Sequence, residues 1–329
     1  MTQRLSVVRT AGDVVPGVAR GMAASDAAAP VARELVHRTS EHEVLPTGWT
    51  RLDGSHFSVS VRWPRDHRCF APVGGHHDAL LVAETMRQAT ILLAHAEMDV
   101  PLDHHFVMWG LEYSVTDVAR LALDDRPDAV ETVVTCSGVQ RRGNRLSSMR
   151  TKYVLWRAGR VLATGRARLT CTSAQVYARL RGERLAAAGL AVPLLPAVPP
   201  EQVGRTAIED VALAPVPQER VWRLRVDSGH PSYFHRPNDH VPGMLLLEAA
   251  RQAARSVSSA DRFVPTAVDV AFHRYAELDS PCWITAGPPR ADPWGGRTVR
   301  VSGHQDNELV FLATLACAAP DEPDEWRSR

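Results

Sequence analysis

The strongest constraint on the fold is an internal repeat. Residues 76–89 read HHDALLVAETMRQA and residues 240–253 read HVPGMLLLEAARQA, so Glu84 aligns with Glu248 and the same Arg-Gln-Ala triplet follows each glutamate. All of these matches keep the same spacing of 164 residues. Matches that keep one spacing indicate duplication of a folding unit. We therefore expect two similar halves within one chain.

The ends of the two halves match as well, because VLATG at 161–165 resembles FLATL at 311–315. Between the halves, four prolines occur within residues 193–200, and a proline-dense stretch is typical of an extended connector. We predict a flexible N-terminal tail, a first domain, a helix with a proline-rich linker, a second domain and a C-terminal tail, at residues 1–33, 34–172, 173–204, 205–319 and 320–329. Within the linker we expect a helix at 173–190 with Ser173 as its N-cap.

Each half shows the same order of expected elements: one strand, one long apolar helix and four further strands. In the first half these lie at 56–63, 79–96, 105–115, 129–139, 149–157 and 161–171. In the second half they lie at 219–226, 243–257, 266–276, 282–287, 298–304 and 308–317. This order predicts an α+β double hot-dog fold, in which an antiparallel sheet wraps a central helix in each half and the two halves pair as a pseudo-dimer.

The composition argues against several classes of protein. The formal net charge is +1, whereas nucleic-acid-binding proteins usually carry a basic excess. No run of 18 apolar residues occurs, so no membrane-spanning helix is expected. The five cysteines are scattered and form no CxxC pair, which favours a reducing cytoplasm over a disulfide framework or a zinc ribbon. Neither GxGxxG nor a P-loop occurs, so no cofactor is predicted.

The helix expected at 243–257 carries polar side chains where a buried helix should be apolar. Glu248, Arg251 and Gln252 lie on one face, at spacings of three and four residues. The first half repeats this arrangement with Glu84, Arg87 and Gln88. Because an unpaired buried charge is costly, these groups must pair with one another, reach solvent or line a pocket. A self-satisfied ion pair and a pocket wall both remain open, and the histidines upstream favour the pocket.

Three histidines precede this helix in the segment HPSYFHRPNDHVPG, namely His230, His235 and His240. The Pro242-Gly243 pair suits a tight turn into a helix start. Histidines grouped with a glutamate can supply a general acid and base. Metal binding is the rival interpretation, but catalytic zinc sites usually have closer ligand spacing such as HExxH. We therefore predict acid–base chemistry and no metal.

At these residues the sequence resembles the A-factor biosynthesis (gamma-butyrolactone synthase) family of actinobacteria. The resemblance covers nearly all of the chain after the first 33 residues, and is carried by LVHRTSEHEVLPTGW at 35–49 and by the segments at 76–89 and 230–253. The part VPGMLLLEA also resembles the PG-x4-E-A signature of hot-dog β-hydroxyacyl-carrier-protein dehydratases, in which an upstream histidine and the helix glutamate act together. Glu248 falls on that glutamate position, and His235 falls one residue short of that histidine position.

The resemblance implies a reaction and its partners. A β-ketoacyl group would pass from a thioester on acyl carrier protein to the hydroxyl of dihydroxyacetone phosphate. The ester would then close by intramolecular condensation to a butenolide phosphate, on the way to a signalling molecule. No nucleic acid or membrane is expected as a partner, and the chain is expected to be a monomeric pseudo-dimer or a homodimer.

This chemistry assigns candidate roles. Glu248 or a nearby histidine would deprotonate the attacking hydroxyl if burial raises the carboxylate pKa. Arg251 or Arg87 would bind the phosphate, and backbone N–H groups at the helix start after Gly243 would stabilise the oxyanion. The candidate catalytic residues are Glu248, Arg251, His235, His240 and Glu84. The candidate substrate-binding residues are Arg87, Gln252, Gln88, His76 and Gly243.

Two other functions remain open at this stage. A hot-dog β-hydroxyacyl-thioester dehydratase or thioesterase would act on a thioester without any phosphorylated acceptor. A non-catalytic acyl-ligand-binding regulatory module would bind its ligand without turnover. DNA binding has the least support, because the chain has no basic helix pattern and almost no net charge.

Overall fold

The computed structural model describes residues 31–72, 74–125, 128–258, 264–291 and 296–317. The predicted C-terminal tail at 320–329 and nearly all of the predicted N-terminal tail at 1–33 lie outside the described residues. Among the described helices, none is long and apolar enough to cross a membrane.

The two halves contain equivalent elements in the same order, apart from the short β11, which has no counterpart among the described residues of the first half. The first half consists of β1 (Pro46–Arg51), β2 (His56–Arg62), α1 (Leu80–Met98), β3 (His105–Val115), β4 (Ala129–Arg142), β5 (Arg145–Arg157) and β6 (Arg160–Thr172). The second half consists of β7 (Leu213–Pro215), β8 (Val221–Leu224), α3 (Gly243–Val257), β9 (Pro265–Phe272), β10 (Trp283–Ala286), β11 (Arg290–Ala291), β12 (Arg297–Gln305) and β13 (Glu308–Cys317). The predicted long helices and the ten predicted strands are confirmed, with differences at their ends. The sequence pattern does not predict β1, β7 and β11.

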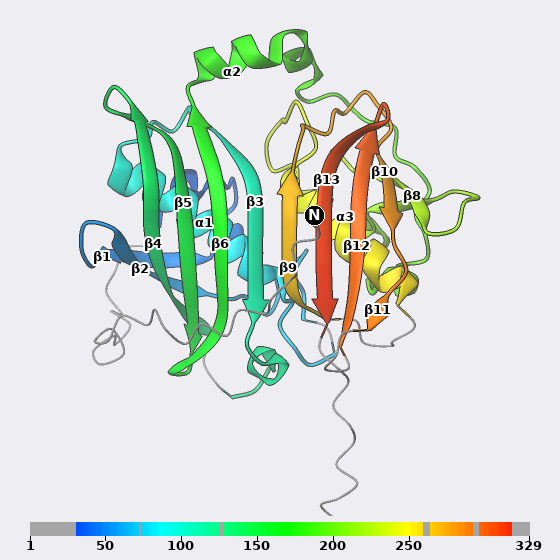
Figure 1. Ribbon diagram of the computed structural model, residues 1–329, viewed down its shortest axis with the longest axis horizontal. Coiled ribbons are helices and arrows are strands. Elements are labelled where there is room, and N and C mark those ends of the chain that lie inside the picture. The colour runs from blue at the N-terminus through cyan, green and yellow to red at the C-terminus, as the bar shows by residue number, and fades with distance from the viewer. Residues whose placement is uncertain (1–30, 73, 126–127, 259–263, 292–295, 318–329) are drawn as a thin grey trace, which may run out of the picture.

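All of the described strands belong to one sheet, in the order β1-β2-β4-β5-β6-β3-β9-β13-β12-β10-β8-β7, with β11 paired to β12. The antiparallel pair of β3 and β9 joins the halves, and Leu111 lies opposite Val270 there. Outward from this pair, the strands of the two halves follow in equivalent order (Figure 1). The chain is therefore a double hot-dog whose halves are related by a pseudo-twofold axis between β3 and β9.

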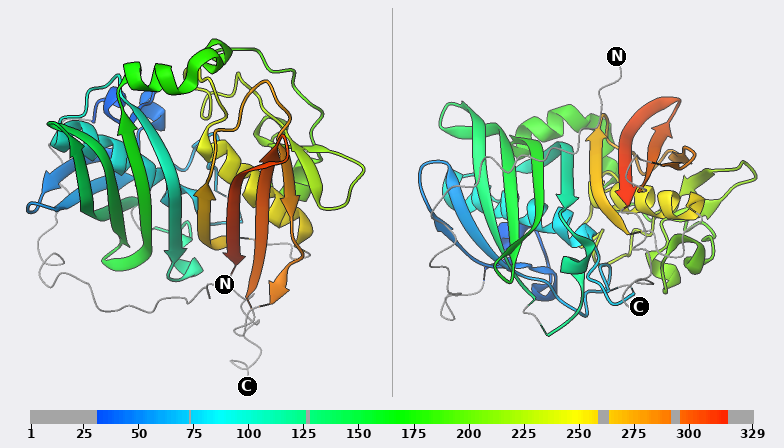
Figure 2. Two further views of the ribbon diagram at one scale, coloured as in Figure 1. Left: turned by 45° about the horizontal axis from the view of Figure 1, so that its top comes forward. Right: turned by 60° about the horizontal axis from the view of Figure 1, so that its bottom comes forward.

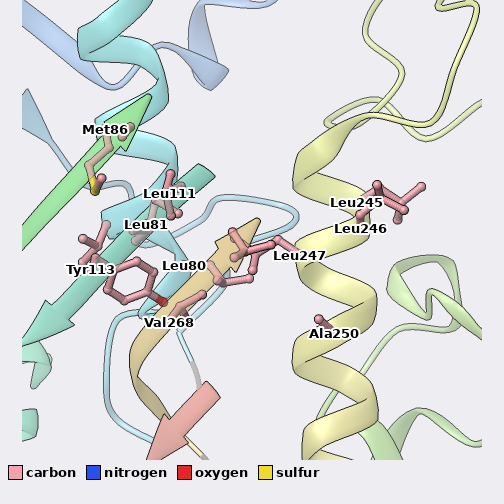
Figure 3. Packing of buried hydrophobic residues seen from close by; sticks show 14 of the residues in the cluster. Leu80, Leu81, Met86, Leu111, Tyr113, Leu245, Leu246, Leu247, Ala250 and Val268 are labelled. Carbon is pink, nitrogen blue, oxygen red and sulfur yellow. The ribbon is translucent and has the colours of Figure 1, made fainter. Parts of the chain in front are cut away.

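The helices α1 and α3 lie on the same side of the sheet, each against the strands of its own half (Figure 2). Of residues 80–95 in α1, only Arg87 is not buried, and α3 is buried continuously from Leu245 to Ala254. Helices with this burial must be apolar nearly all round, which explains their Leu- and Ala-rich sequences. In Figure 3, Leu80 of α1 and Leu247 of α3 point toward each other beside the sheet. The core is thus continuous across the two halves.

The linker begins with a helix that crosses above the junction of the halves (Figure 1). This helix, α2 (Ala174–Arg181), starts at Ser173, whose side chain accepts a hydrogen bond from the N–H of Val176, as predicted for an N-cap. The helix predicted at 173–190 is shorter than expected, because the chain continues as a 3-10 helix at Gly182–Ala187. Arg181 pairs with Asp239 at 2.6 Å and with Glu277 at 2.7 Å, which fixes α2 to the second half.

The contact of α1 with β6 makes a testable prediction at Gly165. A Cβ atom there would lie 2.6 Å from Sδ of Met86 and 2.9 Å from the backbone oxygen of Glu112. We expect Gly165→Ala to lower the free energy of unfolding by about 1–3 kcal/mol, because overpacking forces the helix away from the sheet. Urea unfolding measures this change. Gly54→Ala is the control, since a Cβ at Gly54 meets nothing within 4 Å, and equal stability of the two variants would contradict the expected close contact.

Candidate active site

A buried glutamate in each central helix is held between two arginines. Glu84 accepts hydrogen bonds from Arg87 at 2.8 and 2.9 Å and from Arg38, which reaches it from the segment before β1. We call these three residues the Glu84 clamp. In the second half, Glu248 accepts from Arg251 at 2.7 and 2.8 Å and from Arg205 at 2.8 Å. We call these three residues the Glu248 clamp.

The clamps also connect the two halves. Arg38 donates to the backbone oxygen of Ser232 at 2.7 Å, and Arg205 donates to the backbone oxygen of Cys69 at 2.8 Å. Each arginine therefore pairs with the helix of its own half and reaches a loop of the other half. Since both bonds are buried and charge-assisted, they fix how the halves sit against each other.

The glutamines that follow the glutamates satisfy backbone groups beside the first strand of each half. Gln88 accepts from the N–H of Leu45 at 2.9 Å and donates to the oxygen of Glu43 at 2.7 Å. In the second half, Gln252 makes the same pair of bonds, to Ala212 at 2.8 Å and to Asp210 at 2.7 Å. The repeated Gln88 and Gln252 thus pin strand segments to the helices.

The condition under which Glu248 would act as the base, a pKa raised by burial, is not met. Burial alone would raise it, but the charges and hydrogen bonds of Arg205 and Arg251 outweigh burial and lower the pKa to about 2. The pKa of Glu84 is lowered in the same way, with Arg38 and Arg87 outweighing burial. A carboxylate held ionised between two arginines is a poor proton acceptor at neutral pH. The clamps therefore do not supply the base that the sequence assigns to Glu248.

The cavity with candidate functional groups lies where the two halves meet, has a volume of about 500 Å³, and is covered on one side by the linker. Its apolar lining comes from both halves, with Ile91, Phe106, Met108, Leu246, Val270 and Phe272 among the contributing residues. Its polar lining includes Arg38, Arg87, Tyr177, His235, Arg236, Asp239 and His240. The start of α3, at Gly243 and Met244, also faces this space. The cavity thus combines an apolar wall with grouped basic and titratable side chains.

His235 is a neutral imidazole in this cavity. Loss of solvent, followed by the charges of Arg38 and Arg87, lowers its pKa to about 4. Its Nδ1 lies 3.3 Å from Nη1 of Arg38, and its Nε2 has no hydrogen-bond partner among the described residues. His235 therefore presents an unpartnered ring nitrogen near two arginines.

His240 is oriented by a carboxylate. Its Nδ1 lies 2.8 Å from Oδ1 of Asp239, which also accepts from the hydroxyl of Tyr177 at 2.8 Å. Burial would raise the pKa of Asp239, but hydrogen bonds from His240, Arg181 and Tyr177 lower it. Because an ionised Asp239 only accepts, the ring donates to it through Nδ1, and Nε2 is the nitrogen left to act on a substrate. This is the arrangement expected of a general base.

The structure separates the sequence candidates into three groups. Those that line the cavity are Arg87, His235, His240 and Gly243. Those that lie in or beside the clamps and do not line the cavity are Glu84, Gln88, Glu248, Arg251 and Gln252. His76 is outside both groups, because its Nδ1 lies 3.0 Å from the oxygen of Gly74 and its backbone bridges to Ala122.

Sequence reasoning misses Arg38, Tyr177, Arg236 and Asp239. For Arg38 a signal exists, because Val-His-Arg-Thr at 36–39 matches Val-Gly-Arg-Thr at 203–206. This match has a spacing of 167 residues instead of 164, so a search at one fixed spacing does not find it. Nothing in the sequence marks Tyr177, which comes from the linker helix.

Potential metal ligands come together once among the described residues, at Cys69, Asp210 and His230, whose ligand atoms lie within 4.8 Å of one another. Each already has a protein partner. Nε2 of His230 lies 3.1 Å from Asp210, its Nδ1 accepts from the N–H of Ser232, and the Cys69 thiol donates to Tyr233. Burial also raises the pKa of Cys69, which disfavours the thiolate that metals bind. Of the three histidines before α3, His230 therefore has a structural role.

The Glu248 clamp predicts a pH-dependent stability. Because its folded pKa of about 2 lies below the ordinary value of 4.5, the ionised form stabilises the fold above about pH 4.5, and this contribution is lost as the pH falls toward 2. We expect Glu248→Gln to cost about 3–5 kcal/mol at pH 7, because two buried arginines lose their partner. The difference from the unmodified chain should shrink below pH 4.5 in urea unfolding. The exposed Glu41→Gln is the control, and a cost independent of pH would contradict this role.

Comparison with known proteins agrees with this fold. The sequence matches the family described as A-factor biosynthesis hotdog domain at residues 22–173 and 188–320. It is 47% identical over 285 residues to the 2-oxo-3-(phosphooxy)propyl 3-oxoalkanoate synthase of Streptomyces virginiae, covering 87% of this chain and 96% of the relative. It is also 47% identical over 290 residues to the protein of the same name from Streptomyces coelicolor, covering 88% and 92%.

Among solved structures, the 12:0-ACP thioesterase from Umbellularia californica covers 81% of this chain and 98% of its own, with a TM-score of 0.47 and 14% identity. Sheet order, clamps and cavity define a tandem hot-dog protein whose candidate site lies between its halves. With both halves matched by the family and relatives 47% identical, the chain belongs to the A-factor biosynthesis hotdog family.

Proposed function

We propose that the chain is a 2-oxo-3-(phosphooxy)propyl 3-oxoalkanoate synthase, which transfers a β-ketoacyl group from a carrier-protein thioester to the hydroxyl of dihydroxyacetone phosphate. The observation that carries this proposal is the cavity between the halves, where an apolar wall adjoins arginines and an oriented histidine. The apolar wall suits an acyl chain, because burying its methylene groups contributes about 0.8 kcal/mol each. Membership of the family and the names of the relatives support the same reaction.

His240 is the proposed general base. Its Nε2 takes the proton of the acceptor hydroxyl while the hydroxyl oxygen bonds to the thioester carbonyl carbon. The tetrahedral intermediate then collapses, the carbon–sulfur bond breaks, and the imidazolium returns the proton to the thiolate. Asp239, at 2.8 Å from Nδ1, stabilises the imidazolium formed in between. No acyl-enzyme is required.

The start of α3 is the proposed oxyanion site. Pro242 accepts from the N–H groups of Leu245 and Leu246, and the preceding N–H groups of Gly243 and Met244 have no acceptor among the residues that the structure describes. Both residues face the cavity. Helix N-terminal N–H groups stabilise negative charge that develops on a carbonyl oxygen. This assigns binding of the thioester carbonyl to Gly243, as the sequence suggests.

After transfer, the new ester can close on itself. The carbon between the two carbonyls of the β-ketoacyl group loses a proton and bonds to the ketone carbon of the acceptor part. Loss of water then gives the butenolide phosphate. The candidate residue Glu84 acts in this scheme as a positioning residue, because it holds Arg87, which lines the cavity. Glu248 holds Arg251 outside the cavity lining and has a structural role in the scheme.

Mass spectrometry of the purified chain with a β-ketoacyl thioester, with and without dihydroxyacetone phosphate, tests the proposal. We expect a phosphorylated acyl ester or butenolide only when both substrates are present. Thioester loss independent of the acceptor would instead indicate a thioesterase or dehydratase. An unchanged thioester, also with carrier protein as donor, would indicate a binding module.

The role of His240 has its own test. We expect His240→Gln to lower kcat by about 10²–10⁴, the usual contribution of a general base. His76→Gln is the matched comparison, because His76 aligns with His240 and lies outside the cavity, and we expect a far smaller loss there. Equal losses in the two variants, measured as product formed per second, would remove His240 from this role.

A further inference from the structure

The two helix starts that the pseudo-twofold axis relates are not equivalent. At α1, Asp78 stands just before the helix, and its Oδ1 accepts the N–H of Leu80 at 2.9 Å. The other oxygen, Oδ2, lies 3.7 Å from Nη1 of Arg205 in the Glu248 clamp. Asp78 also contributes, after Glu248, to raising the pKa of Arg251. One carboxylate thus joins the start of α1 to the arginines of the other half.

At α3 the aligned residue is Pro242, which has no side-chain acceptor. The N–H groups of Gly243 and Met244 face the cavity and donate to no acceptor in the described part of the chain. Arg87 of the opposite half lines the same cavity with 17% of its side chain exposed, whereas Arg251 is 7% exposed. Asp78 therefore fills a position beside the Glu248 clamp. The equivalent position, beside the Glu84 clamp at the start of α3, is open to the cavity.

The charges around the two places have opposite signs. Each clamp has one carboxylate and two arginines, and each half adds one further carboxylate nearby. In the first half Glu43 lies beside Arg38, and in the second half Asp210 lies beside His230. Asp78 adds a negative charge at the closed place. Arg236 adds a positive charge at the open place, where it lies 3.5 Å from Nδ1 of His37. Loss of solvent and then the charge of Arg87 lower the pKa of Arg236, so the two cations act on each other.

We infer that the open place binds the phosphate of the acceptor between Arg87, Arg236 and the N–H of Met244, and that Asp78 closes the equivalent place, so that each chain has one acceptor site. Met244 aligns with Leu80, whose N–H Asp78 accepts, so the N–H of Gly243 stays available for the thioester carbonyl. Asp78 shows what the geometry accepts, which is an anion that contacts a helix start and the arginines of the other half. A phosphomonoester has the charge and the acceptor oxygens to fill the same position. The identity of the acceptor rests on the proposed function, but phosphate binding does not.

A substitution at Pro242 tests this inference directly. Pro242→Asp places a carboxylate where α1 already has one, and aspartate is a favourable N-cap, so the helix should not be weakened. Pro242→Asn is the matched control, with the same shape and no charge. The probes are inorganic phosphate, in titration calorimetry without any acyl donor, and dihydroxyacetone phosphate in turnover. We expect Pro242→Asp to raise the Kd for phosphate and the KM for the acceptor at least tenfold more than Pro242→Asn.

Arg236→Gln tests the cationic side of the site. The unmodified chain should prefer dihydroxyacetone phosphate over dihydroxyacetone in kcat/KM, and Arg236→Gln should reduce this preference about ten- to a hundredfold, as expected for the loss of a charge-assisted bond. Arg274→Gln is the control, because Arg274 lines the same cavity but pairs with Glu308 at 3.0 Å. Because the preference is a ratio of two substrates, a general loss of folded protein does not change it.

The outcomes separate this inference from the proposed function. Acyl transfer with an unchanged preference in Arg236→Gln, or with equal effects of Pro242→Asp and Pro242→Asn, would overturn the phosphate site and leave the reaction standing. A second outcome is that one phosphate binds per chain, that Pro242→Asp abolishes this binding, and that no acyl transfer occurs. This outcome would support the phosphate site and contradict the reaction. Two phosphates bound per chain would overturn the closing role of Asp78.

Discussion

The buried arginine–carboxylate clamps satisfy the charges inside both halves and hold the halves against each other. Each places a fully buried glutamate in the central helix of a hot-dog unit, where an unpaired charge would be costly. Arg38 and Arg205 remove that cost, and each also reaches a backbone oxygen in the other half. The same contacts therefore pair the buried charges of Glu84 and Glu248 and fix the interface at which the cavity forms.

Duplication explains why the chain has two clamps, and divergence explains why a cavity opens beside the Glu84 clamp while Asp78 stands beside the Glu248 clamp. The two clamps agree in nearly every hydrogen bond, and so do the neighbouring glutamines Gln88 and Gln252. The differences are concentrated at the helix starts, where Asp78 stands in one half and Pro242 in the other. Asp78 occupies one place, and the other is the place where we propose that the phosphate of the substrate binds. In this way two copies of a fold can keep the same structure while only one of the two equivalent positions is used to bind substrate.

The sequence predicts the fold better than the site. The repeated Glu-x-x-Arg-Gln pattern and the strand order establish two hot-dog halves, and α3 begins and ends at the predicted residues. The same pattern does not show that Glu248 is ionised, because its second arginine, Arg205, lies 43 residues away in the chain. Tyr177 and Asp239 are likewise joined only by the fold. Residues that share one helix face can be recognised from their spacing in the sequence, whereas ion-pair and hydrogen-bond partners from distant segments cannot.

We propose that one phosphorylated acceptor binds per chain, between the two halves. A crystal structure of the chain grown with dihydroxyacetone phosphate tests this most directly. We expect density for one acceptor in the cavity, with its phosphate beside Arg87, Arg236 and the start of α3, and none beside Asp78. A phosphate bound beside Asp78, or only on the outer face of the sheet, would contradict it.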